Sequence, residues 1–402
     1  MKGMRAIALD KASGKPVLKE DVPEPLIGSP DQLLVKVLEV GICGTDRAIV
    51  RAETGEPPPG DAYLILGHEM LGEVVSAGSA AADQYAPGDL VVCTVRRACG
   101  LPECPTCAHG ESDMCYTGKF TERGIFHAHG YMTERIVEST DYTVKLPSAL
   151  RPYGVLMEPT TVVEKAILES VLVQHRLDWV KQLSGGQMIA RDWRFVRRAL
   201  IAGAGPIGMM AAFLLRLHDV ETHVTDVVPA GGYKSSLVNS IGATYWNVTE
   251  TPVTEVAAKV GNIDLIVEAT GIAPVAYELL GALGVNGILV FTGVPGDRGG
   301  EFRMQGGHLM RQQVLWNQVI MGSVNANRSY FVRAAEDLAE IARRWPEALG
   351  KVITAHHPMT DYATALTTQP QDEVKAVFDI VDVSGPAPGT GRIQVPSERG
   401  GG

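Results

Sequence analysis

The hydrophobic pattern of the chain changes near residue 198. Up to that point, short β-branched runs at 33–40, 73–77, 89–95 and 135–139 are separated by Pro and Gly. Helical periodicity is scarce there, and this texture is typical of an irregular antiparallel barrel. Farther along, apolar runs of strand length alternate with segments of helix length. That alternation predicts parallel βαβ units in a doubly wound sheet, so the fold class is α/β.

The elements of this second part can be placed on the chain. We expect strands at 199–203, 222–226, 263–271, 286–293 and 319–325, with helices at 208–218, 233–243 and 274–284. We also expect a helix at 164–173, a polar connector at 174–193, a helix at 331–344 and a last strand at 374–383. The predicted domains are a barrel domain of residues 1–185 and 345–383, a doubly wound domain of residues 186–344, and a disordered Pro/Gly-rich tail of residues 384–402.

Charge and composition narrow the range of partners. The 402 residues include 36 Lys and Arg against 46 Asp and Glu, a net charge of −10, which disfavours attraction to nucleic acid or anionic lipid. The longest apolar stretch, 199–215, is interrupted by a glycine-rich turn and is not expected to span a membrane. The first residues hold no apolar run of signal-peptide length. We therefore expect a cytoplasmic protein whose partners are small molecules.

The glycine-rich turn GAGPIG lies between a predicted strand and a predicted helix. In such a turn Gly203 permits the tight bend, Gly205 lets the backbone approach a pyrophosphate, and Gly208 lets the helix pack against the strand. The turn therefore predicts dinucleotide binding, and a glycine-rich turn without a ligand is the alternative. Its six residues are Gly203, Ala204, Gly205, Pro206, Ile207 and Gly208.

Asp226 ends the next predicted strand, 18 residues after Gly208. A carboxylate there would accept hydrogen bonds from the ribose hydroxyls of NAD and repel the 2′-phosphate of NADP. The residues that follow, VVPAGG, contain no Arg to bind that phosphate. NAD is the expected cofactor and NADP remains possible, whereas on a purely structural interpretation Asp226 only caps a turn.

Four of the six cysteines lie in the loop 99–115, with the spacing Cys99-x4-Cys104-x2-Cys107-x7-Cys115. The loop has few other core-forming residues. Four thiolates at this density suit a closed, tetrahedral structural zinc site that replaces the missing core. Two disulfides or an iron–sulfur cluster are the alternatives, but clustered cysteines in a reducing compartment more often bind metal.

A second set of metal-ligating residue types is dispersed: Cys43 in GICGTD, His68 and Glu69 in LGHE, and Glu158 in LMEPTT. Each is a weak signal alone. Together they supply the thiolate, imidazole and carboxylate of a catalytic zinc that keeps one position for water or substrate. Zinc favours loss of the proton of a bound alcohol, from which hydride can pass to a nicotinamide. Thr45 is placed to hydrogen-bond the alcohol oxygen and relay its proton.

In these motifs and their order, the sequence resembles the zinc-containing medium-chain dehydrogenase/reductase family, and within it the archaeal-type glucose 1-dehydrogenases. GICGTD, GHE, the four-cysteine loop and GAGPIG are motifs of the family; GTDR, TVRR, TGKFTERGI with HGYM, MEP with EKA, and GSVN are motifs of the subgroup. The resemblance covers residues 1–383. It implies a GroES-like barrel as the catalytic domain, a Rossmann domain that binds NAD(P), two zinc ions per chain, and a homodimer or homotetramer.

The resemblance also implies roles for individual residues. Cys43, His68 and Glu158 would hold the catalytic zinc, with Glu69 as an exchanging ligand or a partner of the ligands. The sugar contacts would be Thr45, Glu122, Glu158 and Asn325. The cofactor contacts beyond the glycine turn would be Thr292, Gly293, Val294, Ser323, Val324, Asn325 and Lys375. Without the resemblance, Glu122 could be a solvated loop charge and Asn325 a strand-end cap.

Some positions depart from the family. Ala48 stands where a relay His is common, so a proton would leave through water or another route. Val95 and Val162 replace polar residues that some sugar-oxidising relatives carry, and Asp226 stands where many subgroup members have Arg for NADP. The first two cysteines of the loop are separated by four residues where the family usually has two.

The leading hypothesis is a zinc-dependent dehydrogenase that oxidises the anomeric hydroxyl of an aldose, such as glucose, to the lactone with NAD(P), NAD being preferred. One alternative is a zinc dehydrogenase for a polyol, an aminocyclitol or a secondary alcohol. The other is a non-catalytic dinucleotide-binding protein, against which the presence of Cys43, His68 and Glu158 argues.

Overall fold

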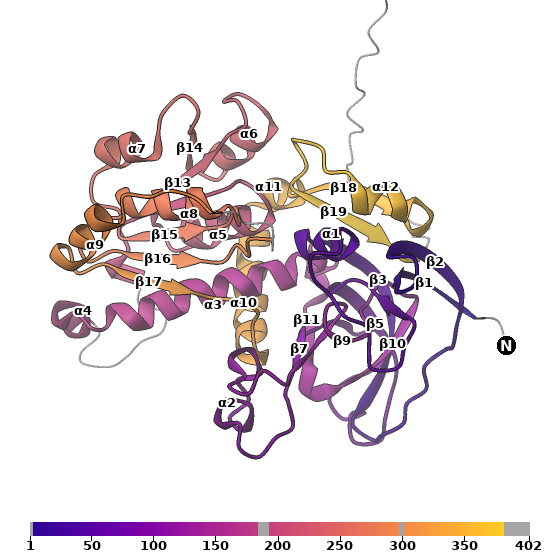
Figure 1. Cartoon of the computed structure of the whole chain (residues 1–402). Coiled ribbons are helices and arrows are strands. Elements are labelled where there is room, and N and C mark those ends of the chain that lie inside the picture. The colour runs from indigo at the N-terminus through magenta and orange to yellow at the C-terminus, as the bar shows by residue number, and fades with distance from the viewer. Residues whose placement is uncertain (1–2, 184–192, 297–300, 382–402) are drawn as a thin grey trace, which may run out of the picture.

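The computed structural model describes residues 3–183, 193–296 and 301–381. These residues form two parts side by side, one rich in short strands and one built on a parallel sheet covered by helices (Figure 1). The predicted tail, 384–402, lies outside the described residues. Within the described ranges, no helix combines the length and the apolar character that crossing a bilayer requires.

The strand-rich part is a mainly antiparallel, irregular barrel. Its strands are β1 (Met4–Asp10), β2 (Lys15–Val22), β3 (Gln32–Ile42), β4 (Tyr63–Ile65), β5 (Glu69–Ala77), β6 (Leu90–Cys93), β7 (Arg96–Arg97), β8 (Thr121–Arg123), β9 (His127–Ala128), β10 (Arg135–Ser139), β11 (Thr143–Leu146), β18 (Ile353–Pro358) and β19 (Lys375–Asp379). The main sheet has the order β11-β6-β5-β3-β19-β18, with β10 paired to β3. Leu33, Val35 and Val37 of β3 enter the core because alternate side chains of a strand point to one face.

The other part contains a six-stranded parallel sheet. Its strands are β12 (Arg198–Ala202), β13 (Glu221–Asp226), β14 (Thr244–Asn247), β15 (Leu265–Glu268), β16 (Ile288–Phe291) and β17 (Val319–Gly322). They lie in the order β14-β13-β12-β15-β16-β17. In chain order this is 3-2-1-4-5-6, the arrangement of a doubly wound nucleotide-binding sheet. The predicted doubly wound sheet is therefore confirmed.

Helices connect and cover these sheets. They are α1 (Gly44–Val50), α2 (Pro105–Ala108), α3 (Met157–Gln174), α4 (Asp178–Leu183), α5 (Pro206–Leu217), α6 (Tyr233–Ser240), α7 (Val253–Val260), α8 (Ala273–Glu278), α9 (Gly306–Leu315), α10 (Arg328–Arg344), α11 (Pro346–Gly350) and α12 (Tyr362–Thr367). Residues 209–215 of α5 are fully buried because α5 packs against the sheet, α3 and α10. The long helix α3 thus lies between the two parts and reaches both.

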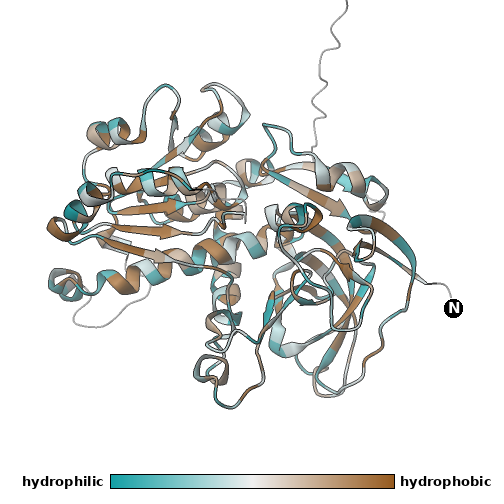
Figure 2. Cartoon of the chain, viewed as in Figure 1, coloured by the Kyte–Doolittle hydropathy of each residue, from teal (hydrophilic) through white to brown (hydrophobic). Residues whose placement is uncertain are grey.

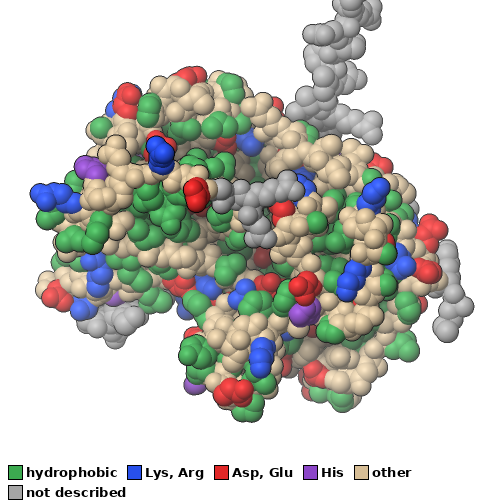
Figure 3. All heavy atoms as spheres, viewed as in Figure 1, with side chains coloured by type: hydrophobic (Ala, Val, Ile, Leu, Met, Phe, Trp, Pro, Cys, Tyr) green, Lys and Arg blue, Asp and Glu red, His purple; other side chains and the backbone are tan. Residues whose placement is uncertain are grey.

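Hydropathy and charge follow this arrangement. The strands of the parallel sheet are largely brown in Figure 2, and their side chains form the core beneath the helices. On the face shown in Figure 3, acidic and basic side chains are interspersed rather than gathered by sign.

The structure corrects several predicted elements. Helix α3 begins at Met157 rather than at residue 164, because Pro159 lies in its first turn, where proline is tolerated. The segment predicted as a polar connector contains the helix α4, and its residues 184–192 lie outside the described ranges. The elements β14, α7 and α9 were not predicted, and β19 is shorter than the strand expected at 374–383.

Candidate metal and cofactor site

Cys43, His68 and Glu69 come together where α1 and β5 begin. The Cys43 sulfur, a His68 ring nitrogen and a Glu69 carboxylate oxygen lie within 4.8 Å of one another. Cys43 is the N-cap of α1, and Glu69 is the first residue of β5. His68 and Glu69 are buried, whereas Cys43 is half-buried. A thiolate, an imidazole and a carboxylate converging from two loops form a donor set suited to zinc.

Asp46 fixes the two segments that carry these donors. Its Oδ2 accepts a hydrogen bond from the Cys43 backbone N–H at 2.8 Å, and its Oδ1 accepts one from the Gly67 N–H at 3.1 Å. Asp46 Oδ1 is also 3.6 Å from His68 Nδ1, a buried nitrogen to which no described residue gives a hydrogen bond. Burial alone would lower the pKa of His68, but Asp46 and Cys43 raise it well above its usual value. An environment that favours a buried positive charge fits a metal cation.

Glu158 and Lys375 complete the charged surroundings. Desolvation raises the pKa of Glu158, on the first turn of α3, to about 7; His68 lowers it and Glu69 raises it. The Glu158 carboxylate is not part of the group of atoms within 4.8 Å. Lys375 of β19 is 1 % exposed, and its Nζ donates to Glu69 Oε2 at 2.5 Å and to the Ile42 carbonyl at 3.2 Å. The contact between Lys375 and the cofactor, which the family resemblance implies, stays a prediction.

The four cysteines of the 99–115 loop also converge. Their sulfur atoms lie within 4.8 Å of one another, and all six cysteines of the chain are free thiols. The Cys104 and Cys115 sulfurs are 3.9 Å apart, well beyond the bond length of about 2.05 Å of a disulfide. The Thr106 hydroxyl, 3.4 Å from Cys104 Sγ, lowers the pKa of that thiol to about 5, whereas desolvation raises the pKa of Cys107 to about 12. The donor set fits a tetrahedral structural zinc.

The glycine turn shows why glycine is required at two positions. Gly203 has a φ of +99°, in the region that glycine adopts readily. A Cβ added at Gly208 would lie 1.8 Å from the Gly203 carbonyl oxygen, so a larger residue would push α5 away from β12. At Gly205, the N-cap of α5, an added Cβ would meet nothing within 4 Å. This open space at a helix N-terminus suits the approach of phosphates.

Asp226 joins the end of β13 to this turn. Its Oδ2 accepts a hydrogen bond from the Ala204 N–H at 2.8 Å, and its Oδ1 accepts one from the Val227 N–H at 2.7 Å. The other predicted cofactor residues follow β16 and β17 at the same carboxyl edge of the sheet, where doubly wound proteins bind ligands. They are Thr292, Gly293, Val294, Ser323, Val324 and Asn325.

Comparison with known proteins agrees with this geometry along most of the chain. Residues 29–148 match the alcohol dehydrogenase GroES-like domain, and residues 151–380 match the glucose dehydrogenase C-terminus. The chain is 35% identical to glucose 1-dehydrogenase of Methanocella arvoryzae over 376 residues, which are 93% of this chain and 98% of that one. The chain belongs to the zinc-containing medium-chain dehydrogenase/reductase family.

Two further relatives of this dehydrogenase illustrate the match. Glucose 1-dehydrogenase of Thermoproteus tenax is 34% identical over 380 residues, covering 94% of this chain and 99% of its own. The structure of Haloferax mediterranei glucose dehydrogenase in complex with NADP, Zn and gluconolactone superposes with a TM-score of 0.81 at 28% identity, covering 94% and 99% of the two chains. The present dehydrogenase therefore has a GroES-like barrel and a Rossmann sheet, and it is a zinc enzyme that uses NAD(P).

Glu122 and Asn325 of the dehydrogenase meet where the barrel faces the Rossmann sheet. Glu122 Oε1 accepts a hydrogen bond from Asn325 Nδ2 at 2.5 Å and one from Arg96 Nε at 3.0 Å, and it forms an ion pair with Arg96 Nη2 at 3.0 Å. Glu122 is 8 % exposed, so it is not a solvated loop charge. The Asn325 side-chain amide donates its hydrogen bond to Glu122 and not to the end of β17, where a strand cap would bond. Thr45 Oγ1 lies 3.7 Å from Cys43 Sγ, beside the candidate metal ligands.

Three buried charged residues near these side chains were not found from the sequence. Asp46 had a usable signal, because it stands three residues after the N-cap Cys43 in the spacing of a capping box. Lys165 lies in the EKA motif, which was not given a role, and Asp113 had no signal because it looks like an ordinary surface charge in its segment. The structure pairs them at 2.8 Å, with side chains 0 % and 1 % exposed.

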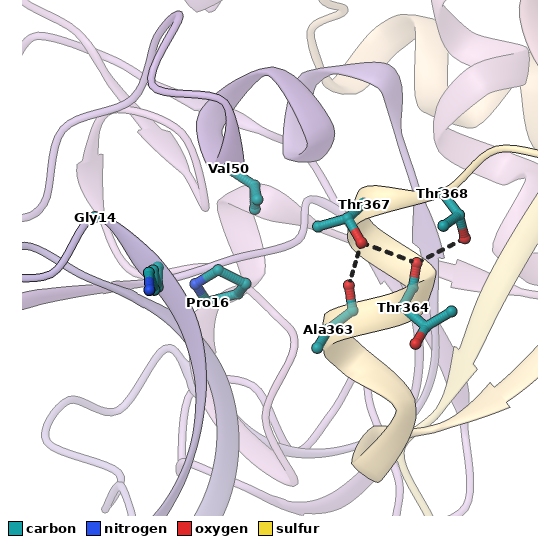
Figure 4. Close-up of a pocket in the computed structure, with 8 residues that line it drawn as sticks. Gly14, Pro16, Val50, Ala363, Thr364, Thr367 and Thr368 are labelled. Carbon is teal, nitrogen blue, oxygen red and sulfur yellow. Dashed lines mark hydrogen bonds between the residues drawn. The ribbon is translucent and has the colours of Figure 1, made fainter.

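One surface depression lies apart from all of these residues. It has a volume of about 480 Å³ and is formed by the start of β2, by Val50 of α1 and by α12 (Figure 4). Two of its three threonine hydroxyls are already used, because Thr367 Oγ1 donates to the Ala363 carbonyl at 2.6 Å and Thr368 Oγ1 to the Thr364 carbonyl at 2.8 Å. Nothing there resembles the chemistry of the metal and cofactor site.

Proposed function

We propose that this dehydrogenase oxidises the anomeric hydroxyl of glucose or a similar aldose to the lactone. The observation that carries the proposal is the cluster of Cys43, His68 and Glu69, whose donor atoms lie within 4.8 Å of one another. The Glu122–Asn325 pair supports a polyhydroxylated substrate, because it presents a carboxylate and an amide side by side. The glucose 1-dehydrogenases among the relatives support an aldose in particular.

Different residues of the chain would have different roles in the reaction. When bound, zinc would stabilise the deprotonated hydroxyl, and NAD(P)+ would accept the C1 hydrogen as hydride. Thr45, beside Cys43, would accept the hydroxyl proton in a hydrogen bond and pass it on to water, since Ala48 offers no imidazole. Glu122 Oε2, to which no described residue donates, would accept a hydrogen bond from a sugar hydroxyl, and Asn325 would orient a neighbouring one.

The substrate is tested with a panel of aldoses, polyols, aminocyclitols and secondary alcohols. We expect aldoses to give the highest kcat/KM, Cys43→Ala to abolish turnover with loss of the catalytic zinc, and Glu122→Gln to raise the aldose KM about tenfold. A polyol or aminocyclitol turned over faster than every aldose would contradict the proposal. Tight NAD(P) binding with two zinc ions and no turnover would instead indicate a non-catalytic binding protein.

NAD is the proposed preferred cofactor. Asp226 supports this preference, because a carboxylate at the end of β13 would repel the 2′-phosphate of NADP. The relative from Haloferax mediterranei was solved with NADP, so the preference is a property to be measured in this chain. We expect kcat/KM to favour NAD, and Asp226→Ser to shift the ratio towards NADP about tenfold. A tenfold preference of the unmutated enzyme for NADP would refute the assignment.

We also propose a homodimer or homotetramer in the cytoplasm. Strand β17 pairs with β16 on one side, and no described strand pairs with its other side. Apolar side chains are exposed beside this edge on α9, at its C-cap and on β17, namely Met310, Val314, Leu315, Trp316 and Ile320. Such an edge with an apolar rim suits association with a second copy.

The proposed location in the cytoplasm is supported by the four-cysteine loop. Its cysteines are free thiols, which favour a reducing compartment.

A further inference from the structure

Asp113 connects the four-cysteine loop to two other segments of the chain. It lies between Cys107 and Cys115, and its side chain is completely buried. Its carboxylate Oδ2 is 2.8 Å from the Nζ of Lys165 on α3, and its backbone carbonyl accepts a hydrogen bond from Arg96 Nη1 at 2.7 Å. Charges buried this deeply are tolerated only when they are paired. The position of the loop is therefore tied to α3 and to β7.

Arg96 carries the first of these connections towards Glu122. Its Nε and Nη2 both lie 3.0 Å from Glu122 Oε1, while Nη1 is held by Asp113. The guanidinium also stacks over the Phe120 ring, 3.8 Å from its centroid. Because the guanidinium is planar and rigid, fixing one of its nitrogens fixes the direction of the others. Glu122 is thus held with Oε1 occupied and Oε2 left for a ligand, as far as the described residues show.

Lys165 carries the second connection towards the edge of the Rossmann sheet. It lies two helical turns after Glu158 on the same face of α3 and is 1 % exposed. Its Nζ donates to the Val324 carbonyl at 2.9 Å as well as facing Asp113. Val324 precedes Asn325, whose backbone has a φ of +59°. The ammonium therefore holds the segment that presents the Asn325 amide.

These contacts close into a ring that runs through Asp113, Arg96, Glu122, Asn325, Val324 and Lys165. We propose that Arg96, Asp113 and Lys165 are positioning residues that set the placement of Glu122 relative to Asn325, and with it the affinity for the sugar. The four-cysteine loop then helps to determine substrate binding, although none of its cysteines is among the proposed sugar contacts. This inference rests on the proposed function, because it takes Glu122 and Asn325 as the sugar contacts.

The Arg96 connection is tested by a double-mutant cycle with Glu122. Arg96→Met is expected to raise the aldose KM about tenfold while kcat stays within about threefold. In the Glu122→Gln background, the same change is expected to alter KM less than about twofold, because Arg96 acts through Glu122. A general loss of structure would lower kcat as well and would add to the effect of Glu122→Gln. The matched control is Arg151→Met, which removes the 2.8 Å contact with Glu39 elsewhere in the barrel.

A conservative variant distinguishes a loss of positioning from a loss of folding. Arg96→Lys keeps a positive charge near Glu122, but a single ammonium cannot replace the three separate nitrogen contacts. We expect it to restore thermal stability fully and KM only in part. Full restoration of KM by Lys would overturn the claim that the rigid guanidinium does the positioning.

The Lys165 connection is tested by removing both charges together, since loss of one would leave the other buried and unpaired. The variant Asp113→Asn with Lys165→Met is expected to raise the aldose KM about tenfold. Release of the Val324 segment should also raise the dissociation constant of NADH or NADPH about threefold, measured by fluorescence titration. The zinc content should remain two ions per chain.

Two outcomes separate this inference from the proposed function. If Glu122→Gln raises the aldose KM but Arg96→Met leaves it within about twofold of the unmutated enzyme, the positioning role is refuted and the proposed function stands. If the unmutated enzyme oxidises no aldose, the proposed function fails. The Lys165 connection is then decided by cofactor binding alone, and an unchanged dissociation constant in the paired variant overturns it.

Discussion

At the scale of single residues, the candidate site depends on buried charges that hold other groups in place. Asp46 accepts hydrogen bonds from the backbone of both ligand-bearing segments, and Lys375 faces Glu69 from a strand at the far end of the sequence. Each of these charges is paired, which is the condition for burying it at an acceptable cost in free energy. Loss of one of these charges would leave its partner buried without a counter-charge, so we expect substitutions there to disturb the candidate metal site.

Asp46→Asn is expected to weaken zinc binding at the Cys43 cluster by about 10-fold to 100-fold, because the carboxylate no longer orients the ligands. The four-cysteine site should be unaffected. After dialysis against a weak chelator, metal analysis should show a fall from two zinc ions per chain towards one. Asp83→Asn, at an exposed position, is the control and should keep both ions. Retention of two ions by Asp46→Asn would contradict the role given to Asp46.

Sequence motifs indicate the candidate metal ligands but not the residues that hold them in place. The four cysteines of the 99–115 loop are indicated by their spacing, and Cys43 and His68 by the motifs GICGTD and LGHE taken together. Lys165 and Asp113 belong to common surface types, and their burial follows only from the packing of α3 against the four-cysteine loop. The charge of Glu122 could likewise be recognised as buried only once Arg96 and Asn325 were seen around it.

At the scale of elements, the C-terminal strands are joined by contacts that depend on pH. His356 of β18 lies 2.9 Å from Asp379 of β19. The hydrogen bond to Asp379 raises the pKa of His356 above 6.5, and partial burial opposes it. Because the folded-state pKa lies above the unfolded value, the pair stabilises the fold below that value. Its contribution is lost as the pH rises through the folded-state pKa.

Asp379→Asn is therefore expected to lower the free energy of unfolding at about pH 5.5 and to leave it nearly unchanged at about pH 8.5. The side chains are 40% and 33% exposed, so the contribution should not exceed about 1 kcal/mol. Urea denaturation at the two pH values measures it, with His356→Gln as the companion variant. Equal destabilisation at both pH values would show that the pair does not act through the charge of His356.

Element boundaries were harder to predict than element types. The alternation of strands and helices after residue 198 was clear because buried parallel strands are almost wholly apolar. Helix α9 begins with Gly306 and Gly307, which have low helix propensity, so its local pattern does not indicate a helix. The start of α3 was set too late because Pro159 reads as a helix breaker unless it lies in the first turn.

At the scale of the whole molecule, the two parts are joined by helix α3 and by the proposed positioning residues, and an apolar edge remains on the outside. The fold class followed from the sequence, because several independent motifs occur in one order. The domain boundaries stay predictions, since α3 packs against both parts and belongs to neither by contact alone.

Leu315→Glu combined with Ile320→Lys is expected to convert the proposed oligomer to smaller species, because charges would be placed in an apolar interface. Sedimentation velocity measures the change in mass. The control is Leu26→Glu, which alters another exposed leucine on the barrel and should leave the mass unchanged. An unchanged mass for the double variant would place the interface elsewhere.

The position of β19 has a consequence for synthesis on the ribosome. It lies between β3 and β18 in the main barrel sheet, although about 330 residues of chain separate Ile42 from its partner Ala376. The barrel strands that are synthesised first therefore lack their neighbour β19 while the Rossmann sheet is translated. Lys375 arrives with that strand, so Glu69 lacks this ammonium partner until β19 has been translated. Nascent chains should accordingly acquire their nucleotide-binding half before their catalytic half is closed.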